Sequence, residues 1–242
     1  MNRNCHLKKP IAALALAWAW AVHAEQAVHA EQAAPIIDMH LHAGGAADNG
    51  PPPMAMCLPL IPNIPLWDPA TEDWGDVFMR WSKEPPCSDP VWSSATDELL
   101  IRETVEAMKA NNVIGVLSGN PTTMTAWLDA APERFMPSIQ MRIGRDDLLT
   151  PDAMRAYFES GTFKVLGEIA NQYSGIAPDD PRMDPYWALA EELDIPAAIH
   201  LGSGPPGAPY LGFPKMRIRD GSALLLEDVL IRYPGLRLSI MH

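Results

Sequence analysis

The sequence predicts an α/β protein in which six parallel strands alternate with helices. Apolar runs of about six or seven residues recur along the chain, and such runs are typical of strands buried on both faces. Segments with helix start and stop signals separate these runs. This alternation implies parallel strands joined by right-handed crossovers, and both an open doubly wound sheet and a closed barrel fit it.

The strands are rich in Ile, Val, Leu, Met and Phe and are expected, in chain order, at Ile36–His42, Val113–Ser118, Phe135–Met141, Phe163–Glu168, Ile195–His200 and Leu236–His242. The helices are recognised by capping side chains, by Pro at the first position and by acidic residues at the start. They are expected near 97–110, after Thr150-Pro151 with an end at Gly161, after Asp184-Pro185, and from a Ser222 cap to about Tyr233.

The charge of the chain favours a small-molecule substrate. Its 242 residues carry 30 acidic and 18 basic side chains, for a formal net charge of −12. A hydrophobic fraction of 48% is typical of a globular protein. Because proteins that hold nucleic acid do so through a basic face, the acidic balance predicts no nucleic-acid partner.

Residues 1–30 have the three-part layout of a secretory signal peptide. A basic head precedes an apolar run from Ile11 to Val22, and small-residue exits end at Ala24 and Ala30. The run of about 12 residues is shorter than the about 20 that a bilayer span needs. We therefore expect cleavage after Ala24 or Ala30, a periplasmic or secreted protein without a membrane partner, and a barrel or sheet domain over residues 31–242.

Residues 43–95 interrupt the alternation between the first strand and its helix. The segment holds ten of the 25 prolines and four of the eight tryptophans. Trp74, Phe78 and Trp81 have the spacing of one buried face of a short helix near 71–83. Because a connection of this length inside a compact domain is usually functional, we expect an insertion that covers the end of the fold where the first strand emerges.

The mature chain retains two cysteines, Cys57 and Cys87, and both lie in the insertion. In an oxidising compartment two such thiols tend to pair, and closing the loop between them would stabilise the fold by about 3–4 kcal/mol. Two unrelated buried thiols are the alternative.

Four histidines end predicted strands. Of the seven in the chain three lie within residues 1–30, and the other four are His40, His42, His200 and His242. The carboxyl ends of parallel strands carry the functional site in α/β folds, because the loops that follow can vary without disturbing the core. The positions of these histidines therefore predict a site at that edge.

His40 and His42 lie two residues apart on the first strand, so that their side chains share a face with that of Asp38. At about 6.6 Å along the strand, both imidazoles can reach one divalent ion. Glu168 ends another apolar run, where a carboxylate is costly unless it is paired or bound to metal. A hydrogen-bonded histidine pair and an exposed loop acid are the alternatives.

Two further polar residues end the second and third strands. Asn120 and Arg142 are candidates for binding substrate, since Arg offers a planar fork to a carboxylate or carbonyl oxygen. Surface polar residues that close a strand are the alternative. The glycines of Gly202–Gly207 match a dinucleotide-binding pattern, but the prolines in and after it prevent the helix that such a loop requires.

The run Ile37-Asp38-Met39-His40-Leu41-His42 resembles the D-x-H-x-H opening of the amidohydrolase superfamily. From about residue 36 to 242 the chain most resembles the amidohydrolase-related branch of metal-dependent hydrolases. The resemblance implies a (β/α)8 TIM barrel with a divalent metal centre, zinc being the expected metal, of one or two ions. The ligands that it implies are His40, His42, Glu168, His200 and His242.

Only about six of the eight strand-helix units are present, so the chain departs from the family pattern. The last strand of the barrel, which carries an Asp in the family, has no counterpart here. The expectation is a C-terminally incomplete barrel that is either a fragment or a form without activity.

The expected function is hydrolysis of a C–O or C–N bond in a small lactone, ester or amide by metal-activated water. Glu168 would be a ligand, a bridge between two ions or a base, and Asp38 would orient a ligand. The same resemblance allows a non-oxidative decarboxylase. A truncated, non-catalytic metal-binding protein is the alternative from another class, and the sequence leaves the oligomeric state open, a homo-oligomer included.

Overall fold

The computed structural model describes residues 34–242, and Ile36–His242 form one unit. The predicted signal peptide at residues 1–30 lies outside the described residues. Across residues 34–242, every helix is too short or too polar to cross a membrane.

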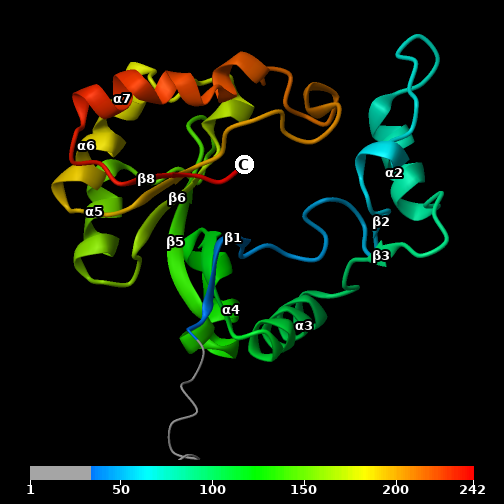
Figure 1. Cartoon of the computed structure of the whole chain (residues 1–242), viewed down its shortest axis with the longest axis horizontal. Helices are drawn as coiled ribbons and strands as arrows, with labels where there is room; N and C mark the ends of the chain where they lie inside the picture. Colours follow the sequence, from blue (N-terminus) through cyan, green and yellow to red (C-terminus); the bar gives the residue numbers. More distant parts are fainter. Residues whose placement is uncertain (1–33) are drawn as a thin grey trace, which may run out of the picture. The chain divides into compact units, whose positions relative to one another are not determined.

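Six parallel strands form one sheet, and the order of the strands in it follows the chain (Figure 1). They are β1 (Ile36–His42), β4 (Val113–Gly119), β5 (Phe135–Met141), β6 (Val165–Ile169), β7 (Ala197–Ile199) and β8 (Leu238–Ile240). Each strand pairs with the next in parallel. A doubly wound sheet reverses its strand order at a switch point, so this order is that of barrel winding. The predicted strands are confirmed, although the last three are shorter than expected.

The helices that link these strands are α3 (Asp97–Ala110), α4 (Pro121–Ala130), α5 (Pro151–Glu159), α6 (Asp184–Glu192) and α7 (Leu226–Arg232). Thr150 caps α5 as predicted, because its hydroxyl accepts from the Ala153 N–H at 3.3 Å.

Two predicted caps are wrong in position. Asp184 is the first residue of α6 instead of its cap, because a 3-10 turn at Pro181–Met183, capped by Asp180, precedes the helix. Ser222 caps a 3-10 turn at Ala223–Leu225, and α7 begins only after that turn.

The two faces of the sheet have different cores because side chains alternate along each strand. Leu117, Ile139 and Leu166 are fully buried and belong to the large core between the sheet and the helices. The neighbouring residues in β4 and β6, Val116 and Val165, belong to a second, smaller cluster that also holds Ala198 and Met241. The inner face of the sheet therefore has a small apolar cluster of its own.

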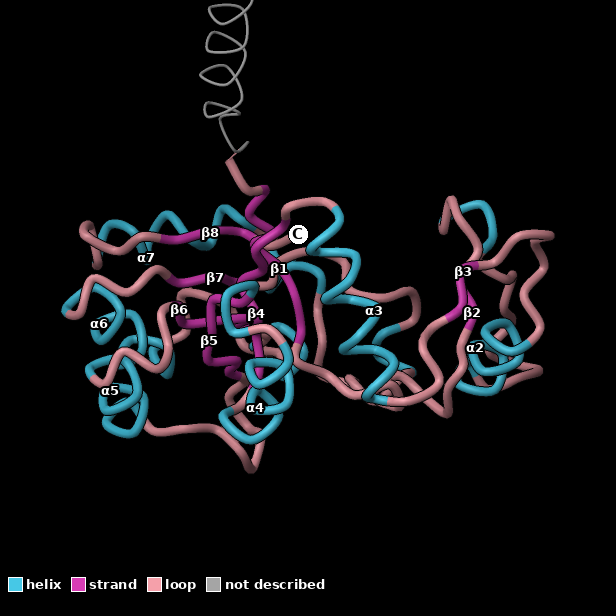
Figure 2. The backbone as a smooth tube through the Cα atoms, turned by 90° about the horizontal axis from the view of Figure 1, so that it is seen from below, coloured by secondary structure: helices cyan, strands magenta, loops and turns pink. Residues whose placement is uncertain are grey.

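The segment between β1 and α3 folds as a lobe of its own (Figure 2). It contains the antiparallel pair β2 (Ala55–Met56) and β3 (Val91–Trp92), together with α2 (Trp74–Lys83). Cys57 and Cys87 form a disulfide, which confirms the predicted pairing.

Aromatic side chains join this lobe to the loop after β7. The Trp74 Nε1–H donates to the Pro206 carbonyl at 3.0 Å. The Trp67 ring lies 4.7 Å from that of Tyr210 and 5.5 Å from that of Trp74. The helix predicted near 71–83 is present, and it presents Trp74 to this loop.

Candidate metal centre

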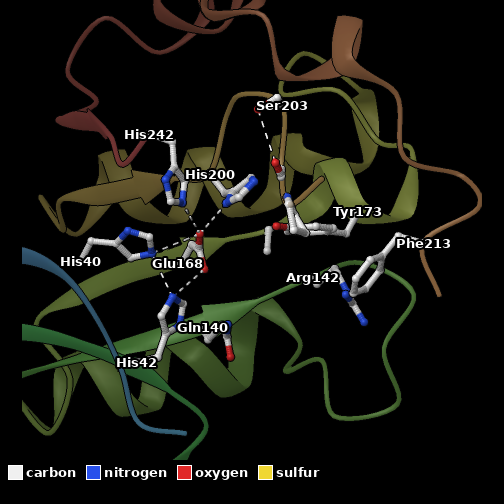
Figure 3. Close-up of a pocket in the computed structure, with 13 residues that line it drawn as sticks. His40, His42, Gln140, Arg142, Glu168, Tyr173, His200, Ser203, Phe213 and His242 are labelled. Atoms are coloured by element: carbon white, nitrogen blue, oxygen red, sulfur yellow. Dashed lines mark hydrogen bonds and ion pairs between the residues drawn. The ribbon is translucent and has the colours of Figure 1, made fainter. Parts of the chain in front are cut away.

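Five predicted ligands meet in one cavity of about 500 Å³ at the carboxyl ends of the strands (Figure 3). His40 and His42 come from β1 and Glu168 from β6, whereas His200 directly follows β7 and His242 lies beyond β8. The structure thus brings together residues that are separated by up to two hundred positions in the chain.

The carboxylate of Glu168 is the centre of this group. Its Oε1 atom lies 2.7 Å from His200 Nδ1, 3.4 Å from His40 Nε2 and 3.6 Å from His242 Nε2. Its Oε2 atom lies 3.5 Å from His42 Nε2. Because Glu168 is 4% exposed, it is a buried acid surrounded by imidazoles, and the alternative of an exposed loop acid is wrong.

The backbone around each ligand explains this convergence. The Asp38 Oδ1 atom accepts from the His40 N–H at 2.9 Å, so Asp38 fixes the backbone of β1 beside the first ligand. Beside Glu168, a Cβ on Gly167 would lie 2.6 Å from the Ala198 carbonyl oxygen. Only glycine allows β6 to approach β7 so closely, and this approach brings Glu168 to His200.

The electrostatics favour an ionised carboxylate at Glu168. Burial alone would raise the pKa of Glu168, but hydrogen bonds from His200 and His40 hold that pKa well below its usual range. The contact with Glu168 raises the pKa of His40, whereas burial lowers the pKa values of His42 and His242.

The donor set fits a divalent cation. Two triads, one of His40, His42 and Glu168 and the other of Glu168, His200 and His242, each place their ligand atoms within 4.8 Å of one another. The Nε2 atoms of His40 and His42 lie 2.9 Å apart, within hydrogen-bond distance, so the alternative of a hydrogen-bonded histidine pair is present beside the shared contact with Glu168. Imidazole and carboxylate ligands suit zinc and similar metals. Glu168 belongs to both triads.

Arg142 lines the same cavity, as predicted for a substrate-binding residue. Its guanidinium lies 5.4 Å from the ring centre of Phe213, and among residues 34–242 no carboxylate forms an ion pair with it. Burial lowers its pKa, as does the nearby charge of Arg145. A half-buried cation that faces a cavity without an acid partner is suited to bind an anion.

Sequence reasoning did not identify three other residues of the cavity wall, Gln140, Tyr173 and Phe213. The Tyr173 ring contacts those of His200 and Phe213 in tilted arrangements, with ring centres 4.8 and 4.6 Å away. The alternation of side chains along β5 was a usable signal for Gln140, because Gln140 is two residues beyond Ser138 and shares its face of the strand. Tyr173 and Phe213 lie in irregular segments, where no periodicity marks them.

Asn120 lies outside this cavity. It is the N-cap of α4, where its Oδ1 atom accepts from the Thr122 and Thr123 N–H groups at 2.9 Å. It lines two neighbouring cavities, and its role in substrate binding stays a prediction.

The family model for Amidohydrolase matches residues 37–242, whereas no curated protein matches the chain. Among solved structures, an uncharacterized TIM-barrel protein from Bordetella bronchiseptica is 18% identical, with a TM-score of 0.49 and coverage of 84% of this chain and 65% of that one. 4-Oxalomesaconate hydratase from Rhodopseudomonas palustris is also 18% identical, with a TM-score of 0.41 and coverage of 85% of this chain and 62% of that one.

This chain therefore spans less than two thirds of the length of either solved protein. The family match begins within β1 and includes all five residues of the histidine and glutamate cluster. On this match, the chain belongs to the amidohydrolase family, with six strands of its barrel and the five helices that link them.

Proposed function

We propose that this protein is a periplasmic or secreted metal-dependent hydrolase that cleaves a C–O or C–N bond in a small organic carboxylate. The observation that carries the proposal is the convergence of four imidazoles on buried Glu168, in a cavity that also exposes the unpaired guanidinium of Arg142. Membership of the amidohydrolase family supports metal-dependent hydrolase or lyase chemistry in general.

The ligand set would hold one or two divalent cations, with zinc as the proposed metal, through His40, His42, Glu168, His200 and His242. A cation there supplies Lewis-acid activation of water and of a carbonyl oxygen. Asp38 holds the backbone of His40 in place through its hydrogen bond to the amide N–H.

The residues around the ligands have separate tasks. The Arg142 fork binds the carboxylate of the substrate, and the Tyr173 and Phe213 rings flank the group that carries it. Glu168 serves as a ligand in this proposal, because hydrogen bonds from His200 and His40 hold its pKa well below its usual range and make it a weak base. Water adds to the acyl carbon, the bond to the alcohol or amine breaks, and the proton released from the water passes to the leaving group, so that an acid and an alcohol or amine result.

Metal analysis of the purified protein tests this proposal. We expect a divalent metal to copurify with the wild-type protein and to be lost from His200→Ala, because that variant removes the ligand with the shortest contact to Glu168. Arg142→Ala is the matched control, because Arg142 lines the same cavity. This variant should keep the metal but no longer bind the substrate.

A panel of esters, lactones, amides and aromatic carboxylic acids then identifies the reaction. Hydrolysis that depends on Arg142 supports the proposal. The proposal is contradicted if the wild-type protein binds no metal after metal-replete expression. If the aromatic acids release carbon dioxide and no substrate is hydrolysed, the reaction is a decarboxylation instead.

A further inference from the structure

A second and larger cavity, of about 870 Å³, adjoins the metal centre. It shares His40, His42, Gln140 and Phe213 with the first cavity, so both open onto the histidines of β1. In Figure 3, Gln140 lies beside His42, whereas Arg142 lies farther along the wall, next to Phe213. The ligand cluster therefore stands where two cavities meet.

The two cavities differ in charge. In the first, Arg142 has no acid partner among residues 34–242. In the second, the Arg145 guanidinium is bound by both oxygens of Asp147, at 2.7 and 2.9 Å. Asp48 also lines the second cavity, where its carboxylate accepts from the Gly45 N–H. An anionic group is thus favoured in the first cavity and repelled from the second.

The second cavity also contains a buried polar group without a partner. Ser118 is 1% exposed, and its hydroxyl has no hydrogen-bond partner in the described part of the chain. It pairs with His42 in the β1–β4 register, so it lies next to a metal ligand. The remaining wall combines apolar and polar side chains, among them Leu100, Trp127, Thr104 and Thr123 of α3 and α4 and Asn49 of the loop after β1. Such a wall suits an uncharged group that offers a hydrogen bond to Ser118.

We propose that the second cavity is a leaving-group chamber, which holds the uncharged alcohol or amine part of the substrate while Arg142 holds the carboxylate of the acyl part. The preferred substrates are then extended monoesters or monoamides of dicarboxylic acids, with the bond to be cleaved at the histidines. This inference rests on the proposed hydrolase function for the direction of cleavage, but the chamber itself is testable by binding.

Two non-hydrolysable ketones serve as probes for the metal-loaded protein, 4-propanoylbenzoate and 4-(3-phenylpropanoyl)benzoate. They share the carboxylate and the carbonyl and differ only in the group that would enter the chamber. Thr123→Trp narrows the chamber from α4, and Thr122→Trp is its matched control, since it places the same bulk on the adjacent residue outside the cavity. Thr104→Phe and Ala107→Phe form a second such pair on α3.

Isothermal titration calorimetry gives the ratio of the two affinities for each protein. We expect Thr123→Trp and Thr104→Phe to reduce the preference for the larger ketone by about tenfold or more, with less than about a twofold change in either control. An unchanged ratio in both chamber variants overturns the proposal, as does a wild-type protein that binds neither ketone. The second pair of variants covers the case in which one substitution prevents folding.

Turnover of monomethyl and monobenzyl terephthalate separates this inference from the hydrolase assignment. If the ratio of ketone affinities shifts as expected but neither ester is cleaved, the chamber stands and the hydrolase assignment fails. If both esters are cleaved and the ratio does not shift, the hydrolase assignment stands and the chamber is wrong.

Discussion

Gly207 lies where Trp74 of the insertion contacts the loop after β7. Its φ is +70°, and a Cβ there would lie 2.2 Å from the Trp74 Nε1 atom. We expect Gly207→Ala to destabilise the protein by about 1–3 kcal/mol, because the left-handed backbone and the contact with the indole both disfavour a side chain. Urea unfolding measures the change.

Gly212→Ala separates the two causes. Gly212 also has a positive φ, +94°, but nothing lies within 4 Å of a Cβ built on it. It should therefore show the backbone cost alone. Equal losses in the two variants would show that the Trp74 contact adds nothing.

At the same scale, the sequence was sufficient to predict the residues of the histidine and glutamate cluster and insufficient for the rest of the cavity wall. Strand parity and the ends of apolar runs determine where His40, His42 and Glu168 point, because both are local properties. Tyr173 and Phe213 reach the cavity from irregular segments, and their positions depend on contacts made far away in the chain. Such contacts leave no periodic signal.

Among the elements, the disulfide-bonded insertion is expected to be an independent unit of stability. Replacing Cys57 and Cys87 together by Ser removes the covalent link between two positions that are 30 residues apart. On chain entropy alone, this link stabilises the folded protein by about 3–4 kcal/mol. We expect hydrogen exchange to accelerate in α2 and the β2–β3 pair, whereas β4, β5 and β6 keep their protection. An equal loss of protection in the sheet would contradict the expectation.

The helix starts show how far local signals reach. The Thr150-Pro151 pair gave the start of α5 correctly, because a capping hydroxyl followed by Pro leaves few alternatives. Asn120-Pro121 is a signal of the same kind, because the Oδ1 atom of Asn120 caps α4. The substrate-binding role of Asn120 stays a prediction. At Asp184-Pro185 the preceding 3-10 turn displaces the start by one residue.

At the scale of the whole molecule, the order of the strands distinguishes an open sheet from barrel winding, which the periodicity of the sequence does not. Open and closed α/β sheets share the same alternation of strand and helix, and only the sequential order of the six strands distinguishes barrel winding. The order also leaves β1 and β8 at the two edges, and in residues 34–242 each of them pairs with a single strand.

These edges predict self-association of the chain. Ile36 on β1 is 62% exposed and Ile240 on β8 is 47% exposed, and unpaired strand edges invite pairing between molecules. We expect Ile240→Lys to reduce the concentration-dependent rise in mass seen by sedimentation velocity. Ile231→Lys is the control, because Ile231 is 70% exposed but lies on α7. An equal reduction in both variants would assign the effect to charge alone.

The ligands come from both edges of this sheet. In a flat sheet β1 and β8 would lie five strand spacings apart, or about 24 Å. Here the imidazole centres of His40 and His242 are 4.5 Å apart, so curvature alone brings them together. A cation shared by the two triads would therefore link the first strand to the last. Its affinity would depend on the curvature of the sheet.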